Sequence, residues 1–147
     1  MPFDISLRLP NEPRICPVRT IPQVQIARVR HHIETYKRFI RPFIATSRVY
    51  HHTPVVRGRE PQGWVVLECV AEDRRRAAVA IFRLAGPGQD EYVLRLRGVD
   101  AGCSYRVTFD NSGETAEFRG ASLKNEGLVM RLARPLTSEL LILEPLD

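Results

Sequence analysis

The segment LRLRGVDAGCSYRV, from Leu94 to Val107, decides the fold. Its first four residues alternate leucine with arginine, which is the two-residue period of a strand with one buried face. Residues 98–102 include two glycines and an aspartate, the residue types that turns favour. From residue 104 to residue 109 apolar and polar side chains alternate again. The segment therefore predicts a strand, a turn and a second strand.

The same pattern of short strands and turns continues from about residue 48 to residue 144. The predicted strands are 48–52, 63–71, 77–84, 92–98, 104–110, 114–119, 127–133 and 138–144. Strands that recur about every ten residues between turn signals are typical of antiparallel sandwiches and barrels. We therefore expect a mainly β protein, an antiparallel β-sandwich of about eight strands preceded by a loop and one amphipathic α-helix.

The one predicted helix covers residues 21–41. Residues 20–23 (TIPQ) resemble a capping box with proline in the first turn. Apolar side chains follow at steps of three and four, which places them on one helix face. These are Ile26, Val29, Ile33, Tyr36 and Ile40. Pro42 predicts that the helix stops near Arg41. Either the sandwich or a second copy of the chain could cover this face, so a homodimer through it is one prediction.

Length and composition bound the remaining choices. A chain of 147 residues suits one domain with a short appendage. No run of about 18 apolar residues predicts a membrane span, and no leader pattern opens the chain; if the chain is complete, we expect a cytoplasmic location. Three cysteines without C-x-x-C spacing indicate neither a disulfide framework nor a zinc site.

Read together, the segments resemble the C-terminal β-sandwich of the melibiase-type α-galactosidases, a glycoside hydrolase family. The hairpin leads into GASL at residues 120–123, EGL at residues 126–128 and SELLIL at residues 138–143, in the order typical of that family. The predicted helix and VYHHTP at residues 49–54 resemble the last helix of the catalytic (β/α)₈ barrel and the crossing into the sandwich. The resemblance implies two parts: residues 1–47, a loop and helix like the end of the barrel, and residues 48–147, the C-terminal β-sandwich domain.

This resemblance implies a non-catalytic role. Retaining glycosidases need two carboxyl groups about 5–5.5 Å apart, and in this family both lie on strands in the middle of the barrel. A barrel cannot close from a loop and one helix. We therefore expect no catalytic residue, cofactor or metal in this chain. The expected partner is the (β/α)₈ catalytic barrel of the parent protein, and the expected role is structural.

Two other functions stay open. Trp64 and Tyr50 are candidate glycan contacts, because aromatic rings in sandwich modules can stack on sugars. A glycan-binding face usually needs several aromatic rings, and the chain has only one tryptophan. The first 59 residues carry eleven basic and three acidic side chains, which could attract an anion. Few aromatic residues interleave with these charges, so we do not expect nucleic-acid binding.

The paired histidines, His31-His32 and His51-His52, are the other residues that suggest a site. Adjacent helical residues point about 100° apart, and adjacent strand residues point to opposite faces of the sheet. Neither pair can therefore present two metal ligands on one face. We expect no metal at either pair.

Overall fold

The computed structural model describes residues 22–53, 62–86 and 88–146, and the chain divides into two compact units, Met1–Ile33 and Glu34–Asp147. The strands are β1 (Arg48–His51), β2 (Trp64–Val70), β3 (Ala77–Arg83), β4 (Glu91–Leu94), β5 (Ser104–Phe109), β6 (Thr115–Arg119), β7 (Leu128–Arg131) and β8 (Thr137–Leu146). The helices are α1 (Gln23–Thr35), the π-helix η1 (Tyr36–Ile40), α2 (Arg41–Ile44) and α3 (Gly120–Asn125). No helix of the described residues has the length and apolar character that a membrane span requires.

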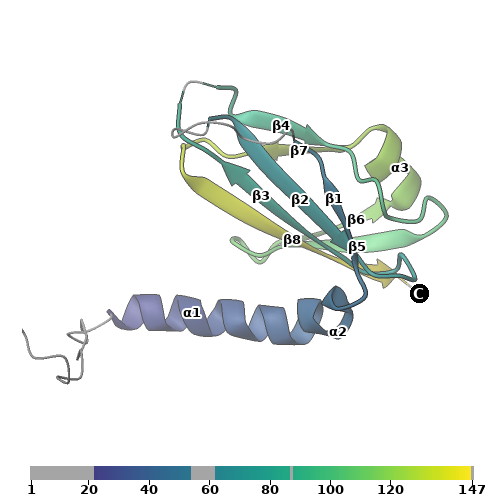
Figure 1. The fold of residues 1–147 in the computed structure, drawn as a ribbon, viewed down its shortest axis with the longest axis horizontal. Helices are drawn as coiled ribbons and strands as arrows, with labels where there is room; N and C mark the ends of the chain where they lie inside the picture. Colours follow the sequence, from purple (N-terminus) through teal and green to yellow (C-terminus); the bar gives the residue numbers. More distant parts are fainter. Residues whose placement is uncertain (1–21, 54–61, 87, 147) are drawn as a thin grey trace, which may run out of the picture. The chain divides into compact units, whose positions relative to one another are not determined.

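Two antiparallel sheets make up most of the second unit (Figure 1). The larger sheet has the strand order β1-β2-β3-β8-β5-β6, and the smaller sheet pairs β4 with β7. The small sheet and α3 lie over one face of the large sheet (Figure 1). The prediction of a mainly β, antiparallel fold with about eight strands after one helix is confirmed.

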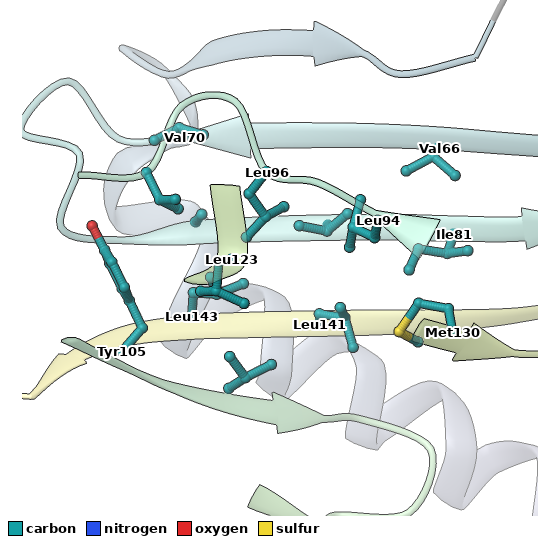
Figure 2. Close-up of a cluster of buried hydrophobic side chains, with 14 residues drawn as sticks. Val66, Val70, Ile81, Leu94, Leu96, Tyr105, Leu123, Met130, Leu141 and Leu143 are labelled. Carbon is teal, nitrogen blue, oxygen red and sulfur yellow. The ribbon is translucent and has the colours of Figure 1, made fainter. Parts of the chain in front are cut away.

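The main core fills the space between the two sheets (Figure 2). Alternation decides its membership: β2 contributes its even-numbered residues, whereas β3, β5 and β8 contribute their odd-numbered ones. The most buried large hydrophobic side chains are Tyr105, Ile81, Leu94, Leu123, Leu141, Leu143, Val66, Val70, Val79, Val99 and Val107. Each such side chain stabilises the fold by about 1.5–3 kcal/mol relative to exposure.

The helical segment differs from the prediction at Pro42. We expected the helix to stop near Arg41, but α2 continues to Ile44 with Pro42 in its first turn, so that prediction is wrong. The cause is the π-helical turn before it, in which the backbone N–H of Arg41 donates to the carbonyl of Tyr36, five residues back. Proline lacks a backbone N–H, and the first turn of a new helix does not need one. A wider turn also relieves the clash that proline makes with the preceding turn.

The π-helical turn also changes which residues share a face. Ile40, predicted to lie on the apolar stripe of the helix, instead packs on the outer face of the large sheet. This second cluster consists of Phe43, Ala71, Ala78 and Ile142, with Phe39, Ile40, Cys69 and Leu140 packed against it. Ile26, Val29, Ile33 and Tyr36 remain exposed. A π-helical turn adds one residue to a turn, which shifts the phase of everything that follows it.

Candidate functional site

The central polar group of the domain is the carboxylate of Glu68, which is 0% exposed. It lies on β2 between Val66 and Val70, and all three side chains point into the core between the sheets. A buried carboxylate is costly unless hydrogen-bond donors surround it. Glu68 is the one carboxylate that is fully buried among the described residues, so its partners explain why it is tolerated.

Three donors satisfy the Glu68 carboxylate. The Nε2 atom of His52 lies 2.6 Å from Oε2. The backbone N–H of Arg97 donates to both oxygens, at 2.9 and 3.2 Å, and the N–H of Gly98 donates to Oε1 at 2.8 Å. Since hydrogen bonds to a charged acceptor are about twice as strong as neutral ones, this carboxylate firmly ties the chain after β4 to β2.

The alternation predicts a strand that ends at residue 98, but β4 ends at Leu94. The same hydrogen bonds explain this difference. The N–H of Leu96 donates to the carbonyl of Leu123 in α3, at 3.0 Å, and the next two N–H groups donate to Glu68. These backbone groups are therefore unavailable to a β-ladder with β7. The Glu68 carboxylate therefore holds this turn in place. Both of its oxygens already accept hydrogen bonds from the protein.

Trp64, the first candidate glycan contact, begins β2 at the edge of the core. Its Nε1 donates to the carbonyl of Gln89 at 3.2 Å, and its ring lies 5.6 Å from the ring of Tyr92, tilted by 34°. Burial raises the pKa of Tyr92, and the charge of Arg97 acts in the opposite direction. Trp64 therefore joins the two sheets, with its indole N–H engaged by the protein itself.

Tyr50, the second candidate, pairs in register with Glu68 across β1 and β2 and packs against the main core. Its ring lies beside Gly98, where an added Cβ would be only 2.6 Å from Tyr50 Cε2. Trp64 lies four residues from Glu68 along β2, a separation of about 13 Å. The structure therefore does not bring the two aromatic rings together into one platform.

The histidine pairs have different surroundings. His51 is exposed at the end of β1, whereas the ring of His52 turns inward to Glu68. The rings of His31 and His32 pack edge to face, with their centroids 5.4 Å apart. His52 is thus a structural partner of a buried acid, a role that the spacing of the histidines does not indicate.

Glu68 was not a predicted site residue, but the sequence carries a signal for it. It is the acidic residue at an inward position of the apolar strand WVVLECV. An acid whose strand parity places it in the core must find donors there. The identity of those donors has no local signal, because they lie 16, 29 and 30 residues away.

The outer face of the large sheet is a second surface of interest. Register places Val65 beside Phe82, and Leu67 beside Ala80, which in turn neighbours Leu140. Phe82 is 40% exposed, and the other four are half-buried. We call these five residues the outer apolar face. Polar side chains usually cover the solvent side of an antiparallel sheet, so an apolar row here is unusual.

Comparison with known proteins gives the chain a family. No curated protein matches it. Among solved structures it is similar to the family 36 α-galactosidase AgaA of Geobacillus stearothermophilus, crystallised as a variant with raffinose, at 21% identity and a TM-score of 0.71, covering 88% of this chain and 17% of that one. The α-galactosidase of Lactobacillus brevis gives 16% identity and a TM-score of 0.67, covering 87% and 17%.

The chain thus spans about a sixth of the length of these neighbours. At this level of identity the likeness shows a shared fold. The family model of the glycosyl hydrolase family 36 C-terminal domain matches residues 64–143, which is more than half of the chain. The match runs from the start of β2 into β8. This chain therefore belongs to the glycosyl hydrolase family 36 C-terminal domains.

Proposed function

We propose that this domain is the non-catalytic, structural partner of a (β/α)₈ catalytic barrel in a glycoside hydrolase that cleaves α-galactosides. The family match supports the parent class, and the α-galactosidase neighbours support the substrate class. In this proposal residues 1–47 correspond to the end of the barrel and residues 48–147 to the accessory sandwich. The domain contributes a docking surface, and the barrel contributes the catalytic carboxylates.

The observation that carries the proposal is the outer apolar face. The main core is filled by the domain's own side chains, so Val65, Leu67 and Phe82 have no role in closing it. Apolar area that stays in contact with water forgoes about 25 cal/mol per Å² of stabilisation. A neighbouring domain would recover that free energy, and η1 and α2 already cover the adjoining part of this face with apolar residues.

The test has two measurements. The purified chain should release no nitrophenol from p-nitrophenyl α-D-galactopyranoside above a buffer control; turnover that survives repurification contradicts the non-catalytic role. The chain should also co-purify with a family 36 catalytic barrel whose own C-terminal domain has been removed. Phe82→Asp should lower that recovery at least about tenfold, because a charge cannot be buried unpaired at an apolar interface.

Val129→Asp is the matched control. Val129 is an apolar residue on β7 of the small sheet and is 61% exposed. Its replacement by aspartate adds the same charge away from the outer apolar face. Equal loss with both variants, or no co-purification, contradicts the docking surface.

The same preparations test the homodimer through Ile26, Val29, Ile33 and Tyr36: a monomer in sedimentation at high concentration would refute it.

A further inference from the structure

A basic pocket lies beside the Glu68 network, because His52 and Arg97, two partners of Glu68, line it. Its volume is about 530 Å³, within the range of small-molecule sites. Residues from three separate segments line it: the end of β1, the chain after β4, and α3. Its basic side chains are His51, His52, Arg95, Arg97 and Lys124, and none of the described residues that line it is acidic. We call it the basic pocket.

The cations of the basic pocket are held in place by backbone carbonyls. Arg97 Nη1 donates to the carbonyl of His51 at 3.2 Å, and Arg95 Nε donates to that of Asn125 at 3.1 Å. Lys124 Nζ donates to the carbonyls of Arg97 and Val99 at 3.3 and 3.1 Å. A guanidinium has five N–H donors, so most donors of both arginines remain available. Side chains held in place this way lose less entropy when a ligand binds.

No ion pair with a carboxylate of the described residues neutralises the charge of these cations. Within residues 22–53, 62–86 and 88–146, no carboxylate forms an ion pair with Arg95, Arg97 or Lys124. Glu68 lies beneath the pocket, but it is fully buried and its oxygens accept from His52 and two backbone N–H groups. Three positive side chains therefore line one pocket in which the described part of the chain places no acidic side chain.

We propose that the basic pocket binds a phosphate-type oxyanion, either free inorganic phosphate or the phosphate group of a phosphorylated sugar. Arginine presents parallel N–H donors that match two oxygens of a phosphate, and lysine adds a point charge. The free donors of Arg95 and Arg97 would contact the oxyanion, with Lys124 at its side. The volume exceeds what a bare phosphate needs, so a sugar attached to the phosphate can be accommodated.

The first experiment uses the wild-type chain and ¹H–¹⁵N spectra. Inorganic phosphate is titrated against chloride at equal ionic strength, and glucose 6-phosphate is compared with glucose. Saturable shifts centred on the amides of residues 95–97 and 124 support the site. Tighter binding of glucose 6-phosphate than of inorganic phosphate identifies the phosphorylated sugar as the ligand; equal or weaker binding identifies free phosphate. Shifts no larger than those with chloride overturn the proposal.

The second experiment measures phosphate affinity for variants. Arg95→Gln and Arg97→Gln together should weaken binding at least about tenfold, because each removes a charged donor pair. The double variant Arg119→Gln with Arg134→Gln is the matched control, since it removes the same charge and both arginines are exposed and outside the pocket. Equal weakening by the control reflects the overall charge of the chain and overturns the proposal. Arg97→Lys keeps the charge without the fork, and an unchanged affinity would overturn the bidentate contact.

Discussion

Replacing Glu68 by glutamine tests whether the buried carboxylate anchors the turn after β4. Glutamine has nearly the same shape, so the change removes charge without creating a cavity. Three donors contact the carboxylate: His52 Nε2, Arg97 N and Gly98 N. A hydrogen bond to a charged group contributes about 1.5–3 kcal/mol and a neutral one about 0.5–1.5 kcal/mol. Glutamine also replaces one acceptor oxygen by an NH2 donor, so the loss of charge and of one acceptor should together cost about 3 kcal/mol or more of unfolding free energy.

Urea unfolding followed by tryptophan fluorescence measures this cost, because Trp64 is the one tryptophan of the chain. With a urea slope of about 1–3 kcal/mol/M, the midpoint should fall by about 1–3 M and the slope should not change. The matched control is Glu117→Gln, since Glu117 lies 3.7 Å from Arg106 and is 64% exposed. An exposed pair of this kind contributes about 0–1 kcal/mol. If Glu68→Gln costs no more than the control, the carboxylate is not an anchor.

Three further predictions concern other positions. Gly120→Ala should destabilise the domain by about 3 kcal/mol or more, because the added Cβ would lie 1.9 Å from the carbonyl oxygen of Asp100. Gly88→Ala is the control in the same urea assay: its added Cβ would have no atom within 4 Å, and stability should change by under about 0.5 kcal/mol. Burial raises the pKa of Tyr105, so the unfolded state loses the phenol proton first and stability should fall as pH rises above about 10. Tyr105→Phe should therefore reduce the fall of the melting temperature at alkaline pH. An unchanged fall would assign it to other groups. Glycan contact at Trp64 predicts a saturable shift of its emission with galactose, and a constant spectrum would refute it.

Local patterns in the sequence were enough to predict most of the strands. In WVVLECV the even-numbered residues point inward, and the prediction of 63–71 matches β2 at 64–70 closely. The turn predicted at residues 98–102 separates β4 from β5. Such patterns succeed because burial of one sheet face repeats every two residues, whichever strand lies alongside.

Short or strained elements were not predictable in this way. The six residues of α3 are too few to show a 3.6-residue period, and Gly120, at its start, lies in close contact with Asp100. The π-helical turn before Pro42 was not predictable either. Pro42 indicates only that the helix is disturbed, and in the structure the helix continues to Ile44 while Phe39, Ile40 and Phe43 pack on the sheet.

The sequence alone therefore determined the fold class, the family resemblance and the direction in which each strand residue points. The tertiary structure decided what those residues meet. Glu68 had to face inward by its parity, but only the strand order β1-β2-β3 and the path of the chain after β4 bring His52 and the amides of Arg97 and Gly98 to it. The convergence of Arg95, Arg97 and Lys124 has the same origin, since periodicity is a local property and contact between distant segments is not.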